Sequence, residues 1–317
     1  MAELSNQLMA LTVLAYLAAM VCYAGEYAFG KRSHIGKAAS RQLVGAGAPV
    51  PPASPVDEVP AKRGKGDIVG LVAVGLNILG LLLHLGTTVT RGIAADRMPW
   101  GNMYEYILST ALIGSAVWAG VLLRKPAVRH LGLFASLTLV VLLGAAALVA
   151  YTPVGPLVPA LESYWYVFHV STIIISSGIF LVGVVPAITF LIKDGWDAGK
   201  RSFPYTLGRH IGDAGVLERL TFRLHAFAFP LFTFGALIAG PLWAEASWGR
   251  YWGWDPKEVW AFISWIVYAA YLHARATPSV KRTTATWIAV AGFVTMLMNL
   301  FGVNLFFEGL HSYANAG

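Results

Sequence analysis

Apolar residues fill long stretches of this chain, and charged residues collect in the segments between them. A membrane-spanning helix needs about 20 largely uncharged residues. Ile68 to Thr90 carries no formal charge, and Ser163 to Ile192 is uncharged and long enough to tilt or to kink at Pro186. The pattern predicts an all-α membrane helix bundle with eight spans, near residues 7–29, 68–90, 104–123, 131–151, 166–192, 224–244, 256–274 and 284–307.

Composition supports a membrane protein. Of the 317 residues, 57% are apolar and 12% are charged, and the mean hydropathy of +0.62 excludes ordinary soluble, disordered and collagen-like chains. The single cysteine, Cys22, cannot form an internal disulfide or supply CxxC or CxxCH chemistry, so such thiols must belong to a partner. The first apolar stretch lacks the basic start and small-residue cleavage site of a signal peptide, so we expect a retained helix.

Basic residues predict the orientation, because they collect in cytoplasmic loops during insertion. Nineteen of the 23 lysines and arginines fall in four alternate connections, at 30–66, 124–130, 193–223 and 275–283. The four on the other side are Arg91, Arg97, Arg250 and Lys257. Both termini are therefore expected outside. This topology accounts for the net charge of +7, so nucleic-acid binding is not needed to explain it.

The chain divides into three parts. Residues 1–29 form the first transmembrane helix, and 30–66 is rich in proline, alanine and glycine, as in a disordered cytoplasmic linker. Residues 67–317 form a seven-helix domain, whose connection at 193–223 has the composition of a loop with a short interfacial helix. We find no internal repeat at a fixed period, which disfavours a transporter built from inverted repeats.

Tryptophans gather near one outer connection. Six of the eleven lie between Trp243 and Trp265. An aromatic belt at the membrane interface is one interpretation, but a belt spreads over many helix ends. The segment Ser247 to Trp260, SWGRYWGWDPKEVW, instead sets Trp248, Trp252 and Trp254 among glycines and charges. This tryptophan strip offers flat apolar faces and close backbone approach, which suit a large planar hydrophobic ligand.

The strip also contains a predicted helix start. Asp255 is a good N-cap, Pro256 fits the first turn, and Glu258 falls three residues after the cap, as in a capping box. Asp255 therefore has two interpretations, a purely structural cap and a residue that also contacts a ligand.

Histidines are the candidate ligands, because a planar hydrophobic ligand suggests haem and haem iron binds imidazole. His169 and His311 are both expected outside beside the tryptophan strip, where they could approach one iron from opposite faces. Taken alone, each is more often a hydrogen-bonded interfacial residue than a ligand, and only their joint position beside the strip favours the ligand role. The four histidines expected in or near the cytoplasm are interpreted as solvated or interfacial residues: His34, His130, His210 and His225.

Two further histidines lie within predicted spans. His273 is 17 residues from Pro256, roughly 25 Å along a helix and therefore near the cytoplasmic leaflet. His84 lies among leucines and should face the bundle, since an imidazole facing lipid is costly. For both, a haem-ligand role and a helix-to-helix hydrogen bond remain open.

These residues carry a family resemblance. The segment WGRYWGWDPKEVWAFISW resembles the WWD signature of the cytochrome c assembly family of haem-handling membrane proteins, known as CcsA, ResC or, in some bacteria, CcsB. Four further segments resemble family features: RMPWGNMYEY an outer loop, SYWYVFHV and GLHSY the two external histidine segments, and YLHAR the inner histidine. The resemblance covers the second to the eighth predicted helix.

The resemblance implies a subunit of a System II cytochrome c synthase in the cell membrane. Haem b would enter from the cytoplasm, pass His273 and rest outside on the strip between His169 and His311. There the thiols of an apocytochrome c CxxCH segment would add across the haem vinyl groups. The implied partners are a Ccs1/ResB-type membrane subunit and, indirectly, thiol-reducing proteins.

Haem propionates require cations, and Arg250 is the first candidate, ahead of Arg91, Arg97 and Lys257. Snorkelling at the interface or pairing with Asp96 or Glu105 is the alternative for these residues. Three functional alternatives also remain: a haem transporter without a synthetic role, a small-solute transporter, and a membrane electron-transfer cytochrome.

Overall fold

The computed structural model of the chain describes residues 1–29 and 65–311. All regular elements in these two ranges are helices, which confirms the all-α prediction. The predicted linker lies outside the described residues except for positions 65 and 66, which begin a helix.

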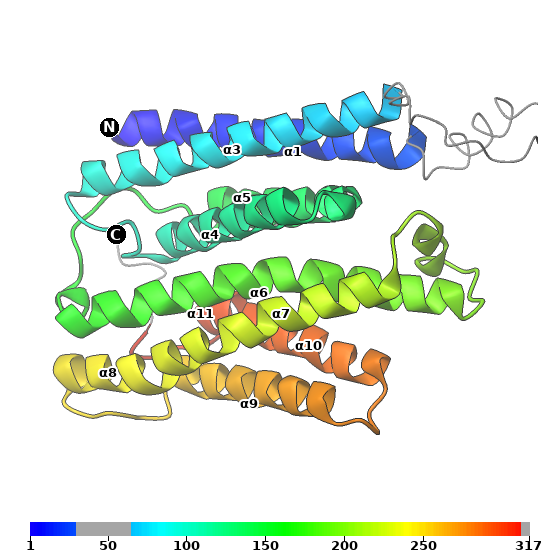
Figure 1. Cartoon of the computed structure of the whole chain (residues 1–317). Coiled ribbons are helices and arrows are strands. Elements are labelled where there is room, and N and C mark those ends of the chain that lie inside the picture. Colours follow the sequence, from blue (N-terminus) through cyan, green and yellow to red (C-terminus); the bar gives the residue numbers. More distant parts are fainter. Residues whose placement is uncertain (30–64, 312–317) are drawn as a thin grey trace, which may run out of the picture.

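Ten α-helices are described, numbered as in Figure 1: α1 Ala2–Phe29, α3 Lys65–Ala95, α4 Met103–Arg124, α5 Gly132–Val149, α6 Tyr164–Asp197, α7 Ala214–Phe234, α8 Gly240–Trp248, α9 Pro256–Ala276, α10 Arg282–Leu297 and α11 Val303–Phe306. Three short 3₁₀ turns connect them, at Pro126–Leu131, Pro159–Leu161 and Tyr205–Arg209. The turn at Tyr205–Arg209 is the short helix expected in the connection at 193–223.

Seven helical segments in the described chain are long and apolar enough to cross a membrane, so this is a multi-pass membrane protein. One runs continuously from α7 into α8, Ala214–Trp248, and another from α10 into α11, Arg282–Phe306. The seventh predicted span, 256–274, corresponds to α9, which has 21 residues but is not one of these seven segments. Its charged first turn and its C-terminal His273 and Arg275 make it less apolar than its neighbours.

The helices form a bundle around α6 (Figure 1). The pair α1 and α3 lies on one side, α4 and α5 lie between that pair and α6, and α7, α9 and α10 pack on the other side. Figure 1 also shows the N-terminus at the same end of the bundle as α8. We refer to this as the α8 end.

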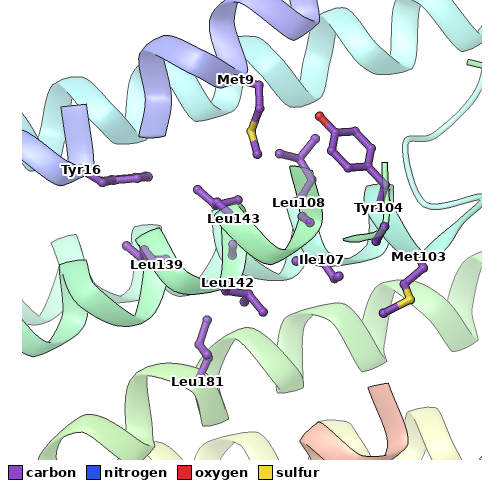
Figure 2. Close-up of a cluster of buried hydrophobic side chains, with 13 residues drawn as sticks. Met9, Tyr16, Met103, Tyr104, Ile107, Leu108, Leu139, Leu142, Leu143 and Leu181 are labelled. Carbon is purple, nitrogen blue, oxygen red and sulfur yellow. The ribbon is translucent and has the colours of Figure 1, made fainter. Parts of the chain in front are cut away.

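A buried cluster joins the first helices to α6 (Figure 2). Met9 and Tyr16 of α1 face Leu108 of α4 and Leu143 of α5, and Leu181 of α6 closes the opposite side. Lipid tails are as apolar as leucine, so such helices associate through close packing and interhelical hydrogen bonds. Tyr16 supplies both, because its hydroxyl also donates to Ser115 Oγ at 2.6 Å.

A buried ion cluster fixes the connection between α3 and α4 at the α8 end. Arg91 Nε donates to Glu105 Oε1 at 3.0 Å, and Arg97 Nη1 donates to Glu105 Oε2 at 2.6 Å. Arg91 and Arg97 also donate to the carbonyls of Thr152 and Gly155, respectively. Breaking such a buried cluster leaves uncompensated charge, so the segment between the two helices is held firmly.

Two π-helical turns interrupt the long helices. Gly235–Ala239 lies between α7 and α8, and Met298–Gly302 lies between α10 and α11. The wider turn leaves some carbonyls outside the regular helical hydrogen-bond pattern, and such turns are frequent at functional sites. Neither turn was predicted from the sequence.

His225 is not solvated. It is 1% exposed in α7, where its Nδ1 donates to the Thr221 carbonyl at 2.8 Å and its ring lies against Tyr268 and Tyr271. Gly183 of α6 makes room for it, because a Cβ there would lie 2.8 Å from the imidazole. The interpretation as a solvated residue was therefore wrong.

Candidate functional site

A cavity opens where both π-helical turns, α6, α8 and the start of α9 come together. It encloses about 1260 Å³ of empty space, counting the open space at its mouth. The side chains of His169, His311, Trp243, Trp252 and Lys257 all line it. Two histidines that are 142 positions apart in sequence thus share one cavity.

His169 is held in one orientation. Its Nδ1 donates to the carbonyl of Gly235, in the π-helical turn, at 2.8 Å. The same carbonyl accepts the backbone N–H of Gly240, and a Cβ at Gly240 would lie 3.1 Å from the imidazole. The irregular turn and its glycine therefore let the ring approach the backbone closely.

His311 is held by a carboxylate. Its Nδ1 donates to Asp255 Oδ2 at 2.8 Å, and the backbone N–H of Leu310 donates to Asp255 Oδ1 at 2.6 Å. A Cβ at Gly309 would lie 2.5 Å from the same oxygen, so glycine permits this approach. Asp255 thereby connects the start of α9 to the segment that carries His311.

Asp255 also caps α9, as predicted. Its side chain accepts the Lys257 N–H, and Glu258 Oε2 accepts the N–H groups of Asp255 and Gly253, which completes the capping box. Burial acts to raise the pKa of the Asp255 carboxyl, but hydrogen bonds from His311 and the two backbone N–H groups outweigh it, so the pKa is lowered. Asp255 is therefore a structural cap that also binds His311, and its contact with a ligand stays a prediction.

Trp243 lies against both histidines. Its ring is stacked on His169, with centroids 5.4 Å apart and planes 10° apart, and its centroid is 5.3 Å from that of His311. The histidine centroids are therefore no further apart than the sum of these distances. Trp243 is itself 2% exposed and donates its Nε1 to the Ala160 carbonyl at 2.8 Å.

Both imidazoles have the tautomer expected of iron ligands. Donation from Nδ1 places the neutral ring's lone pair on Nε2, and metal-binding histidines usually donate their other N–H to a carbonyl or a carboxylate. Within residues 1–29 and 65–311, no group of three or more histidine, cysteine, aspartate or glutamate side chains is arranged to hold a metal ion. A haem brings four pyrrole nitrogens to its iron, so it requires only one or two protein ligands.

The tryptophan strip is divided between two environments. Trp252 lines the cavity, and its buried Nε1 has no hydrogen-bond partner in the described chain. Trp248 contacts His311 edge-on, with centroids 4.8 Å apart. Trp254 is 66% exposed, adopts a positive φ of 56° and touches Trp252 edge-on. Trp254 is thus available to a partner surface.

The four outward basic residues also differ. Arg91 and Arg97 are bound to Glu105, the pairing considered from the sequence. Arg250 is exposed and covers Gly253, where a Cβ would lie 2.5 Å from the guanidinium carbon. Lys257 lines the cavity and donates its Nζ to the Asn299 carbonyl at 2.8 Å. Neither Arg250 nor Lys257 makes an ion pair with a described residue.

The two intramembrane histidines lie away from the cavity. His84 is fully buried, with Nε2 donating to the Leu108 carbonyl at 3.0 Å and Nδ1 3.4 Å from the Tyr16 hydroxyl. This arrangement agrees with the helix-to-helix alternative. His273 is exposed near the other end of α9, where its carbonyl accepts from Thr277. A ligand role for either residue stays a prediction.

The residues that contact and orient the candidate ligands were not predicted from the sequence. Trp243 appeared only as one member of the tryptophan cluster, and neither Gly235 nor Gly240 was considered. The spacing of these glycines around a helical stretch that precedes Pro241 was the available signal, since glycine and proline mark irregular helix.

Known proteins match this chain over the residues that line the cavity. The profile of the family described as "Cytochrome C assembly protein" matches residues 100–311, a range that contains the whole cavity lining. The proteins named "Cytochrome c biogenesis protein CcsA" from Gloeobacter violaceus and Guillardia theta are each 34% identical to this chain. These alignments cover 76% of this chain and 86% and 85% of the relatives.

A solved structure has a similar fold. "Cytochrome c Heme Lyase CcmF" superposes with a TM-score of 0.57 at 18% identity, over 95% of this chain and 46% of that protein. This chain thus spans less than half of that structure, and the likeness concerns the fold alone. With a family profile that matches two thirds of its length and relatives aligned over most of both sequences, this chain belongs to the cytochrome c assembly protein family.

Proposed function

We propose that this chain holds haem b at the outer membrane surface and presents it to the CxxCH segment of apocytochrome c, as the haem-handling subunit of a System II cytochrome c synthase. Family membership ties the chain to cytochrome c maturation, and the relatives are named as cytochrome c biogenesis proteins. One observation carries the proposal: His169 and His311 line the same cavity, each with Nδ1 anchored.

The cavity has the chemistry that a porphyrin requires. Its walls include Trp243, Trp252, Met296 and Leu300, which would bury an apolar macrocycle at roughly 25 cal/mol per Å². Two imidazoles saturate the iron and keep oxygen from reacting there while haem waits. Lys257, inside the cavity, and Arg250, near its strip, are the proposed propionate partners.

Thioether formation needs positioning more than acid or base groups from the protein. Each substrate thiol adds its sulfur and its hydrogen across one vinyl C=C bond, so no atom leaves and no external oxidant or reductant is consumed. Holding the vinyl groups beside the incoming thiols converts this addition into an effectively unimolecular step. The exposed Trp254, adjoining the cavity residue Trp252, is a proposed contact for the substrate peptide.

The proposed route begins at the cytoplasmic end. The α8 end would face outward, in the cell membrane, and His273 would be an inner haem station. The exposure of His273 leaves its imidazole accessible to a ResB-type subunit, which would supply a second ligand.

The test uses the full chain purified with its membrane partner. The wild-type complex should acquire haem and transfer it to a reduced CxxCH peptide, which gains covalently bound haem. His169→Ala and His311→Ala should each weaken the Soret band and the yield of haem peptide, because one axial ligand is removed. His130→Ala removes a histidine that contacts Ala127 and Gly212 and lies outside the cavity, and should leave both unchanged.

Two outcomes would contradict the proposal. If neither ligand variant alters the Soret band or the yield, the histidines do not hold the haem. If the wild-type complex moves haem across vesicle membranes but never attaches it to the peptide, the chain is a transporter without a synthetic role.

A further inference from the structure

The two candidate ligands are anchored by different chemistry. His169 donates to a neutral backbone carbonyl, and His311 donates to the Asp255 carboxylate. Hydrogen bonds to an ionised acceptor are roughly twice as strong as those between neutral groups. The His311 anchor is therefore the stronger of the two.

Each of the two acceptors also binds a second donor, and this competition increases the difference in strength between the two histidine anchors. The Gly235 carbonyl that holds His169 also accepts the N–H of Gly240. Asp255 Oδ2 is shared with the Lys257 N–H, but at the longer distance of 3.2 Å. Because the Leu310 N–H holds Oδ1, the carboxylate is fixed in the plane that presents Oδ2 to His311.

A carboxylate partner changes the ligand itself. Drawing the Nδ1 proton toward a negative oxygen increases electron density on Nε2 and makes the imidazole a stronger donor to a metal. A carbonyl oxygen does this less, because it carries no net charge. His311 is thus the stronger donor to iron, and His169 the weaker.

We propose that the two axial ligands bind the iron with unequal strength. His311, supported by Asp255, retains the haem, and His169 is the ligand that the incoming CxxCH histidine replaces. This inference rests on the proposed function and adds the order of ligand exchange. The exchange is balanced, since one iron–nitrogen bond breaks as another forms and both imidazoles remain neutral. Asp255 acts through His311 and is a positioning residue.

The first experiment compares haem retention by the full complex carrying His169→Gly or His311→Gly, measured as the rate of haem loss to excess apomyoglobin. Outer-shell partners change metal affinity by about 10- to 100-fold. We expect His311→Gly to lose haem at least about 10-fold faster than His169→Gly. Equal rates, or faster loss from His169→Gly, would overturn the proposal.

The second experiment isolates ligation from bond formation with mesohaem, whose ethyl groups cannot form thioethers. Adding a reduced CxxCH peptide to the His169→Gly complex should restore a low-spin spectrum, and a CxxCA peptide should not. In the His311→Gly complex, the CxxCH peptide should have no such effect. Restoration in His311→Gly alone would show that the order of exchange is reversed.

Asp255→Asn tests the positioning role. Asparagine is also a good N-cap, so the change removes the charge and retains the helix start. We expect a more positive haem reduction potential, because a weaker donor stabilises ferric iron less, and haem loss about 10-fold faster. Asp213→Asn is the matched control, since Asp213 caps α7 without contacting a histidine. An unchanged potential in Asp255→Asn contradicts the inference.

These results separate the inference from the proposed function. If the wild-type complex acquires no haem, the proposed function fails. If the wild type binds haem in a bis-histidine state and the two glycine variants behave alike, only the inferred inequality fails.

Discussion

The indole ring of Trp243 lies flat against the imidazole of His169, with the ring planes 10° apart and the centroids separated by 5.4 Å. The same indole meets His311 at 64°, so one buried side chain contacts both candidate ligands. Trp243 is itself anchored by the hydrogen bond from its Nε1 to the Ala160 carbonyl. It is a wall of the cavity, and if haem binds between the two histidines we expect it to act as a template for the ligation geometry.

Replacing Trp243 should change the spectrum of the bound haem even where the amount of bound haem stays the same. We expect Trp243→Leu to alter the g-values of the ferric haem in electron paramagnetic resonance, because those values follow the angle between the imidazole planes. Trp243→Phe should lie closer to wild type, since it preserves a stacked ring. Trp118→Leu removes an equally buried tryptophan that does not line the cavity. If Trp118→Leu and Trp243→Leu leave the same g-values as wild type, Trp243 has no templating role.

Glu105 should be important for stability. It is fully buried and is the carboxylate that pairs with both Arg91 and Arg97. Glu105→Gln should lower the free energy of unfolding by about 3–5 kcal/mol, because two buried guanidinium groups lose their counter-charge. Thermal unfolding in detergent measures this, with the exposed Glu162→Gln as a control. Equal melting temperatures for the two variants would mean that the cluster adds little stability.

Lys257 should contribute more than Arg250 to recognition of the propionates, since it lines the cavity. Charged hydrogen bonds contribute about 1.5–3 kcal/mol, so the wild-type complex should bind haem about 10- to 100-fold more tightly than haem dimethyl ester. Lys257→Met should remove most of this preference and Arg250→Met less. Affinities from Soret titration test the order. A preference that survives in Lys257→Met and disappears in Arg250→Met would assign the role to Arg250 instead.

Alanine substitution of His84 and of His273 should affect stability and haem loading in different ways. His84→Ala breaks the bond to the Leu108 carbonyl, so we expect a loss of about 1–3 kcal/mol in stability with normal haem loading. His273→Ala should leave stability unchanged and reduce haem at the outer site in cells, because the supply is interrupted. Haem added directly to the purified His273→Ala complex should restore the Soret band. Normal loading of His273→Ala in cells would exclude it from the route.

The sequence supports accurate prediction of local features. Runs of apolar residues place the membrane helices, since a span is a property of consecutive positions. The capping box at Asp255 was predicted for the same reason, because its partners lie within three residues. His169 and His311 could be paired only by the topology and by the resemblance.

Contacts between distant segments could not be predicted in this way. The bond from His311 to Asp255 spans 56 positions, and that from His169 to Gly235 spans 66. Both depend on backbone that departs from regular helix, at Gly309 and in the π-helical turn. No hydrophobic period in the sequence encodes such a departure. The stacking of Trp243 on His169 is also a contact between distant segments, so it could not be predicted from the sequence either.

Spin state tests the central claim most directly. Ferric haem in the wild-type complex should give the low-spin electron paramagnetic resonance signal of two imidazole ligands, since His169 and His311 both reach one cavity. His169→Gly and His311→Gly should each shift the signal to high spin, and added imidazole should restore the low-spin form. A low-spin signal that persists unchanged in both variants would contradict the claim, because the iron would then take its ligands from elsewhere.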